Sequence, residues 1–251
     1  MSRDEVREQD WGGTHVETRQ VERTNSIGDR VLDFYLNGER PNVTTPGIAI
    51  MDPFATPEVK QAAADFYATF YPDNRDRVLM IGINPGRFGG GLTGIPFTDP
   101  WALTNPCGIA TTITGQRELS SVFVYDMIEH YGGPTAFFGD VLLSAGLPFG
   151  LISGRKNVNY YDDRTLMSEL TPYILRTLET QLTFGGRRDV AIVLGTGKNH
   201  DYLRRINAEY RFFDQLIPLE HPRFIMQYRL KRKDEYLERY VDTLNGAVNK
   251  S

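Results

Sequence analysis

The sequence VLMIGINPGRFGGGLTGIPF, residues 78–97, decides the predicted fold and the place of its site. It opens with an apolar run that has the length and composition of a buried parallel strand. The run breaks at Gly82, and the turn Asn84-Pro85-Gly86 follows. Because Pro85 restricts the residue before it to extended backbone, Asn84 is held rigidly at the carboxyl end of the strand. Open α/β sheets place ligand-contacting groups at this edge.

The glycines of the same stretch allow other interpretations. Gly89, Gly91 and Gly94 satisfy the pattern G-x-G-x-x-G of dinucleotide sites, but that pattern must open a helix directly after the strand. Here Pro85-Gly86 intervene, and Pro96 prevents a long helix beyond. The Gly-Lys-Ser/Thr of a phosphate-binding P-loop does not occur in the stretch. The remaining structural alternative is a plain glycine-rich surface loop.

Length and composition indicate a soluble globular protein. The 251 residues are 40% hydrophobic and 24% charged, and the apolar runs are far shorter than a membrane span. The polar, acidic N-terminus is unlike a signal peptide, so we expect a cytoplasmic protein. A single cysteine, Cys107, rules out an intrachain disulfide and a four-cysteine iron–sulfur cluster. With a net charge of −4, binding to nucleic acid requires the basic residues to gather on one face.

Strand-like and helix-like segments alternate along the chain. We expect strands at 78–83, 140–145, 190–194 and 213–219, and helices at 26–36, 56–70, 118–131, 165–181, 200–210 and 231–244. This alternation predicts an α/β fold, a three-layer αβα sandwich around a central four-stranded parallel sheet. Residues 1–25 are predicted to be a polar tail, and residues 26–251 a single domain.

Two motifs resemble those of a known family. Gly82-x-Asn84-Pro85-Gly86-x-Phe88-Gly89, followed by Thr93-Gly94-x-Pro96-Phe97, resembles the first motif of the SMUG-type uracil-DNA glycosylases. Leu219-Glu220-His221-Pro222-Arg223, at the end of the last expected strand, is similar to the His-Pro motif of the same superfamily. The resemblance extends over roughly residues 78–245, points to the bacterial branch and implies the αβα sandwich of this family.

The resemblance also implies an activity. It is that of a monofunctional DNA glycosylase that hydrolyses the N-glycosidic bond of uracil, and of related damaged bases, and so initiates base excision repair. The partner would be uracil-containing DNA, single- or double-stranded. The protein would be a cytoplasmic monomer that meets this DNA at the nucleoid, and it would need no metal, cofactor or membrane. The alternatives are a superfamily glycosylase specific for a deaminated purine, and a non-catalytic α/β protein that binds nucleic acid or nucleotides.

The resemblance assigns catalytic roles to the polar residues of the two motifs. Asn84 would hold the attacking water, since an amide offers an acceptor and donors in one plane. His221 would donate to uracil O2, where negative charge develops as the bond breaks. A lone histidine is more often a hydrogen-bonded structural residue, but a proline follows both Asn84 and His221, and both stand at strand ends.

Base binding is assigned to the first motif and its surroundings. Phe97 would stack on the flipped base, with core packing as the alternative, and the backbone of Gly86 and Phe88 would meet the base edge. The family's asparagine near the end of the second strand has no counterpart, and Ser144 stands there instead. Asn159, in an Asn/Asp-rich loop, is the other candidate to read the base, unless that loop serves only as turn and capping chemistry.

The segment after the His-Pro motif is predicted to enter the duplex where the base leaves. Its apolar side chains would fill the vacated stack while cations hold phosphates. The alternative is a core segment leading into a solvated basic helix. Cations after other turns, Arg155 and Lys156 among them, could extend the phosphate track. The residues predicted to bind DNA or to form the wedge are Arg87, Lys198, Arg223, Met226, Tyr228, Arg229 and Lys231.

Overall fold

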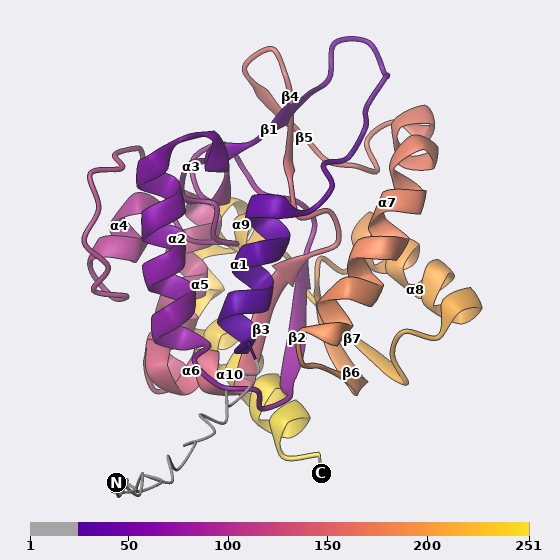
Figure 1. Cartoon of the computed structure of the whole chain (residues 1–251). Helices are drawn as coiled ribbons and strands as arrows, with labels where there is room; N and C mark the ends of the chain where they lie inside the picture. Colours follow the sequence, from indigo (N-terminus) through magenta and orange to yellow (C-terminus); the bar gives the residue numbers. More distant parts are fainter. Residues whose placement is uncertain (1–24, 251) are drawn as a thin grey trace, which may run out of the picture.

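The structure of the chain, a computed structural model, describes residues 25–250. Its centre is a four-stranded sheet in the order β3-β2-β6-β7, with every neighbouring pair parallel (Figure 1). The strands are β2 (Arg77–Gly82), β3 (Val141–Ala145), β6 (Gly186–Leu194) and β7 (Gln215–Leu219). The predicted four-stranded parallel sheet is therefore confirmed, although β6 begins earlier and β7 later than expected.

Helices cover both faces of this sheet. The helices α1 (Ile27–Asn37), α7 (Arg164–Thr183) and α8 (Lys198–Tyr210) lie on one face, and α5 (Leu119–Tyr131) and α10 (Lys233–Val248) on the other (Figure 1). Every residue of β2 and β3 is buried, as the continuous apolar runs predict for strands covered on both faces. The predicted three-layer αβα sandwich is confirmed.

A second, antiparallel sheet lies beyond the carboxyl end of the first. It consists of β1 (Ala49–Met51), β4 (Gly150–Ser153) and β5 (Lys156–Val158), in the order β1-β4-β5. The sequence analysis did not predict it, because strands of three or four residues are too short to show a period of two. The sheet matters for function, since the end of β5 approaches the turn after β2.

Short helices occupy several segments in which the sequence analysis expected no helix. They are α3 (Gly90–Thr93), α4 (Pro100–Thr104), α6 (Pro134–Asp140) and α9 (Pro222–Tyr228). The last three begin with proline, as does the longer α2 (Pro57–Phe70), because proline at the first position has no amide hydrogen to leave unpaired. The glycine-rich run makes a single helical turn that ends at Gly94, whose φ is +74°. Two 3-10 turns, η1 (Pro53–Ala55) and η2 (Leu230–Arg232), complete the elements.

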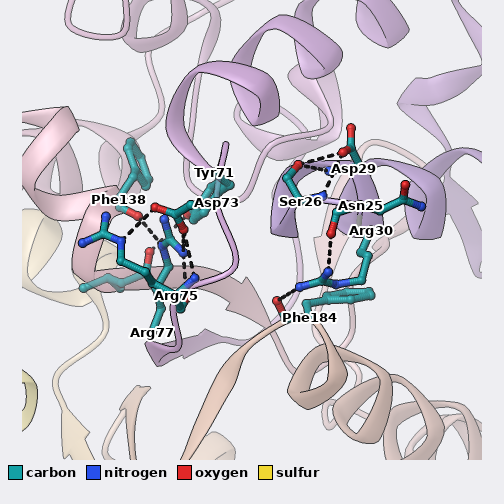
Figure 2. A network of polar contacts seen from close by, with 11 residues as sticks. Asn25, Ser26, Asp29, Arg30, Tyr71, Asp73, Arg75, Arg77, Phe138 and Phe184 are labelled. Atoms are coloured by element: carbon teal, nitrogen blue, oxygen red, sulfur yellow. Dashed lines mark hydrogen bonds and ion pairs between the residues drawn. The ribbon is translucent and has the colours of Figure 1, made fainter. Parts of the chain in front are cut away.

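A buried arginine anchors the start of β2 (Figure 2). Arg77 donates to the Phe138 carbonyl at 2.7 Å, and to Asp73 Oδ1 and the Arg75 carbonyl at 2.8 Å each. Burial acts to raise the pKa of Asp73, but hydrogen bonds from Arg77 and Arg75 outweigh burial and hold that pKa well below its usual range. The charge of Asp73 therefore compensates a guanidinium that has no contact with water.

The first helix is tied to the same end of the molecule (Figure 2). Ser26 caps α1 in a reciprocal capping box with Asp29. Arg30 donates to the Phe184 carbonyl, just beyond α7, at 3.0 Å. The polar tail predicted for residues 1–25 lies almost wholly outside the described residues. In the described part of the chain, no helix is long and apolar enough to cross a bilayer.

Replacing Asp73 by Ala is expected to destabilise the protein by about 2–3 kcal/mol, because it leaves Arg77 buried without its charge partner. This value is below that of a fully buried pair, since the Asp73 side chain is 35% exposed. The folded-state pKa of Asp73 is depressed, so its contribution is present above about pH 4 and is lost as the pH falls further.

Urea unfolding measured at pH 7 and at pH 3 tests this expectation. The difference in the free energy of unfolding between wild type and Asp73→Ala should be smaller at pH 3 than at pH 7. Arg75→Ala is the control, because the Arg75 side chain is 66% exposed and its pair with Asp73 should be worth under about 1 kcal/mol. Equal losses in the two variants at pH 7 would contradict the assigned role of Asp73.

Candidate active site

A cavity of about 590 Å³ opens at the carboxyl edge of the parallel sheet. Its walls are the turn after β2, the start of α9 after β7, the β4–β5 hairpin and the loop that follows β5. Asn84 and His221 both line it, although β6 separates their strands in the sheet. The two strand-end residues that the sequence analysis singled out therefore meet at one edge of the sheet. The edge is the one at which open α/β folds bind ligands.

The amide of Asn84 is held at both ends by the backbone. Its Nδ2 donates to the Val158 carbonyl at 3.0 Å, and its Oδ1 accepts from the Tyr160 N–H at 3.2 Å. These bonds fix which end of the amide is oxygen, and they leave one N–H hydrogen and one oxygen lone pair unused. The amide can therefore hold a water molecule in a defined place.

A chain of hydrogen bonds supports this backbone clamp from behind. The hydroxyl of the buried Tyr160 donates to Asn199 Oδ1 at 2.7 Å, and Asn199 Nδ2 donates to the Leu194 carbonyl at 3.1 Å. The clamp is thereby connected to the end of β6 and the first turn of α8. The sequence analysis did not identify Tyr160 or Asn199 as functional residues.

His221 faces the same cavity in its neutral form. It is the N-cap of α9, and its Nδ1 accepts from the Arg223 N–H at 3.2 Å. Since Nδ1 uses its lone pair in this bond, the neutral ring carries its proton on Nε2. Burial, and secondly the positive charge of Arg223, lower the pKa of His221 to about 4. At neutral pH His221 is therefore an uncharged hydrogen-bond donor with a fixed tautomer.

The ring of Phe97 lies between the two motifs. Its centroid is 6.0 Å from that of His221, and a Cβ on Gly82 would collide with it. Gly82 is therefore needed to let the ring approach the end of β2. Phe97 has a φ of +55°, a conformation that is uncommon outside glycine and that concentrates at functional sites. It packs partly on the core and also lines the cavity, so the core contact is present and stacking on a base stays a prediction.

The turn after Asn84 contributes backbone and side chains to the cavity. Gly86, Arg87 and Phe88 all line it, and the Arg87 guanidinium lies 4.3 Å from the Phe88 ring centroid. The Arg87 N–H is already used, since it donates to Asn157 Oδ1 at 3.2 Å. Backbone contact with a base from this turn would therefore come from the neighbouring amides.

The two side chains predicted to read the base edge differ in position. Ser144 does not line the cavity; its hydroxyl donates to Gln181 Oε1 at 2.5 Å on the face covered by α7. Its place on β3 points it away from the site, so its predicted role is wrong, and Ala145 forms that part of the wall. Asn159 does line the cavity, but its amide also donates weakly to Asp162 Oδ1 at 3.4 Å.

Positive charge gathers around the cavity. Arg87, Arg155, Lys156 and Arg223 line it, against the single carboxyl of Glu118 among the lining side chains of the described chain. This local excess is what a chain with a net charge of −4 needs in order to bind a polyanion. Arg155 and Lys156 stand at the tip of the β4–β5 hairpin, opposite α9.

The predicted wedge segment divides into exposed and packed residues. Tyr228 is 66% exposed and Phe224 39% exposed, and both line the cavity on α9. Met226 is half-buried, packs against the core and does not line the cavity, so the structure does not bring it together with Tyr228 and Phe224, and its wedge role stays a prediction. The helical period of α9 explains this, because the sequence analysis treated the segment as if all its apolar residues shared one face.

The remaining predicted DNA-binding residues lie outside the cavity wall. Arg229 is exposed with its guanidinium 5.2 Å from the Phe224 ring centroid, and Lys231 is exposed in η2. Lys198 opens α8, with its Nζ 5.9 Å from the centroid of Tyr161, a lining residue. Phe224 and Gln227, which also line the cavity, belong to the predicted wedge segment. The lining residues Glu118, Asn157 and Tyr161 were not selected by the sequence analysis. Nothing in the local sequence of these three distinguishes them from ordinary helix-start or turn residues.

The geometry suits cleavage of a bond to a planar leaving group. A clamped amide can hold water, an aromatic ring can cover a flat ligand, and a neutral imidazole can donate to a developing anion. Within residues 25–250, no three His, Cys, Asp or Glu side chains gather in a way that could hold a metal ion.

Comparisons with known proteins agree with this geometry. The family model "Uracil DNA glycosylase superfamily" matches residues 68–245. The crystal structure of wild-type SMUG2 from Pedobacter heparinus is similar with a TM-score of 0.85 and 41% identity, over 90% of this chain and 99% of that one. A search of curated proteins finds no match. The expectations drawn from the two motifs are thus confirmed at the level of the family, and the chain belongs to the SMUG-type branch of the uracil-DNA glycosylase superfamily.

Proposed function

We propose that this protein is a monofunctional glycosylase that hydrolyses the N-glycosidic bond of uracil in DNA and so initiates base excision repair. The observation that carries the proposal is the pairing of a clamped Asn84 amide with a neutral His221 in one cavity. Residues 26–251 would act as one glycosylase domain. A monomer is proposed because one chain supplies every element of the site, and the place of action would be the nucleoid in the cytoplasm.

The proposed reaction begins with a uracil flipped onto Phe97. The bond between C1′ and N1 breaks with its electron pair moving into the ring, so negative charge develops on the uracil carbonyl oxygens. His221 Nε2–H donates to O2 and stabilises that charge, as an oxyanion hole does. The water held by Asn84 adds through its oxygen to C1′ and releases a proton to solvent. An amide is a poor base, so bond breaking must run ahead of water attack.

The cavity rim would hold the DNA around the flipped nucleotide. Tyr228 and Phe224 are the exposed apolar side chains placed to fill the vacated stack, and their rings lie 5.5 Å apart between centroids. Arg223 on the α9 side and Arg155 and Lys156 on the hairpin side would contact phosphates on either side of the opening. This arrangement accepts both single-stranded and paired uracil.

A deaminated purine is the second candidate for the substrate. The observation that favours it is the wall at Ala145, which is small and has no amide to recognise the uracil edge. A panel of oligonucleotides containing uracil, hypoxanthine, xanthine or an oxidised pyrimidine separates the two candidates by the free base that is released. Release of none of these bases would favour a non-catalytic binding protein.

Asn84→Ala is expected to lower the single-turnover rate of uracil release by about 100-fold or more, because the attacking water loses its place. The product should be an intact strand with an abasic site, measured by alkaline cleavage on a denaturing gel. His200→Ala is the control, because His200 lies on α8 outside the cavity wall. A folded Asn84→Ala protein with a near-wild-type rate would remove Asn84 from the mechanism.

Tyr228→Ala is expected to reduce cleavage of paired uracil far more than cleavage of uracil in a single strand. Flipping a base out of a duplex costs a few kcal/mol, which a wedge offsets, whereas an unpaired base costs much less. The measurement compares single-turnover rates on the two substrates. Tyr210→Ala controls for loss of an exposed tyrosine, because Tyr210 is 48% exposed at the end of α8. Equal losses on both substrates would show that Tyr228 supports the fold or the base pocket instead.

The double variant Arg155→Ala/Lys156→Ala is expected to flatten the salt dependence of DNA binding. Each lost phosphate contact lowers the slope of log K against log salt by roughly 0.7–0.9, so two lost contacts lower it by roughly 1.5. Binding isotherms at several salt concentrations measure the slope. Arg204→Ala/Arg205→Ala, an exposed basic pair on α8, should leave it unchanged. An unchanged slope in the hairpin variant would place the DNA elsewhere.

A further inference from the structure

Glu118 is the one carboxyl among the cavity-lining side chains of the described chain, and the mechanism above does not use it. The carboxyl oxygens of Glu118 lie close to the turn that follows Asn84, because a Cβ on either Gly86 or Gly89 would collide with the carboxyl group. The two glycines therefore leave room for this carboxyl beside the turn that meets the base.

The backbone of Glu118 is fixed firmly. Its N–H donates to Asp99 Oδ2 at 3.0 Å, and its carbonyl accepts from the Val122 N–H at 2.9 Å as α5 begins. Asp99 is itself buried, where it caps α4 through Ala102 at 2.8 Å and accepts from Arg117 Nε at 3.0 Å. The side chain of Glu118 thus extends into the cavity from a rigid base.

The carboxyl oxygens of Glu118 make no hydrogen bond with any other residue in the part of the chain that the structure describes. Asp99, Asp163 and Asp73, by contrast, each accept hydrogen bonds that cap a helix or hold an arginine. A carboxyl that is placed on a rigid base and left without protein partners, inside a ligand cavity, has its hydrogen-bonding capacity available for the ligand.

The charge state of Glu118 follows from its surroundings. Burial raises its pKa to about 7; the positive charge of Arg223 opposes this rise, and the negative charge of Asp99 adds to it. The other charged groups around the cavity are Arg87, Arg155 and Lys156, while His221 is neutral. Near and below neutral pH a substantial fraction of Glu118 therefore carries a proton and can donate a hydrogen bond.

We propose that protonated Glu118 is a second donor to the leaving base, to the carbonyl oxygen that His221 does not contact. This inference rests on the proposed function, in which negative charge spreads over both O2 and O4 of uracil. His221 would serve O2, and Glu118, beside the Gly86–Gly89 turn, would serve O4. The proton stays on Glu118 while the C1′–N1 electron pair moves into the ring. Ionised Glu118 would lose this hydrogen bond and repel the developing anion.

The test measures single-turnover release of uracil from a single-stranded oligonucleotide between pH 5.5 and 9. For wild type we expect the single-turnover rate to be constant up to about pH 7 and to decrease above it. The decrease should approach tenfold per pH unit if only the protonated form of Glu118 reacts. Glu118→Gln keeps an N–H donor but does not titrate, so it should retain the plateau to within about tenfold and lose the fall. Glu129→Gln, on the outer part of the same helix, is the matched control and should keep the wild-type profile.

A substrate change tests the contact itself. An oligonucleotide with 2-pyrimidinone, which lacks O4, should react more slowly than uracil with wild type. Glu118→Ala should release uracil about 10- to 100-fold more slowly than wild type, which is the effect of removing one oxyanion donor. On 2-pyrimidinone the rates of Glu118→Ala and wild type should be similar. Equal losses on the two bases would overturn the contact with O4.

Stability gives a readout that does not depend on activity. The folded-state pKa of Glu118 is raised above its ordinary value of 4.5, so its contribution to stability is full below about pH 4.5 and is lost as the pH rises through about 7. The melting temperature of wild type relative to Glu118→Gln should therefore fall over this range, provided both variants fold. No fall would show that folding leaves the pKa of Glu118 at its ordinary value, so that the carboxyl is ionised near neutral pH, and would overturn the proposal.

The outcomes separate this inference from the proposed function. If wild type releases no base from any substrate at any pH, the proposed function fails. If wild type releases uracil and Glu118→Gln keeps the same descending limb, only the role of Glu118 fails, and its carboxyl serves to support the turn.

Discussion

The site depends on one constraint, the fixing of the Asn84 amide by the backbone at Val158 and Tyr160. An asparagine side chain that turned freely about its last bond would present its oxygen and nitrogen interchangeably, and a water bound to it would have no defined position. Here one donor and one acceptor of the amide are already used, so the remaining pair has a single orientation. The second sheet positions the Val158 carbonyl of this clamp, and the hydrogen bond from Tyr160 to Asn199 holds the neighbouring backbone.

A main-chain hydrogen bond fixes His221 in a similar way. Its backbone contact with Arg223 decides the tautomer, and burial keeps the ring neutral, so the proton lies on Nε2, as the proposed mechanism requires. A charged imidazolium would bind an anion more strongly, but burial makes that state costly. Asn84 and His221 are thus both tuned by main-chain hydrogen bonds, which can be placed with less freedom than contacts between long side chains.

The cavity is lined by charges of both signs. Four cations surround the opening and favour a polyanionic strand, while the carboxyl of Glu118 lies among them. An acidic protein can bind DNA in this way because screening limits the reach of its other charges to about 10 Å at ordinary salt. The acidic remainder of the surface would then oppose nonspecific contact away from the site.

The order of the four parallel strands and of the long helices, and the two strand-end motifs, could be predicted from the sequence. Buried parallel strands are continuous apolar runs, and proline after Asn84 and His221 restricts the local backbone wherever the chain folds. The structure differed from expectation where the outcome depended on which way a side chain points. Ser144 lies in β3, one residue from Ala145, and the alternation of a strand turned it toward Gln181. Met226 and Tyr228 lie on one short helix, but only Tyr228 faces the cavity.

The sequence by itself therefore determined the parallel sheet and the edge at which Asn84 and His221 stand, because apolar periodicity and proline-restricted turns are local, and the resemblance of two motifs indicated the family. Only the tertiary structure decided what surrounds them: the antiparallel sheet, the clamp on Asn84, the hairpin cations and Glu118. These contacts join segments as far apart as Asn84 and Tyr160, and no local pattern encodes which distant backbone group will meet a given side chain. Packing of the whole chain sets that choice.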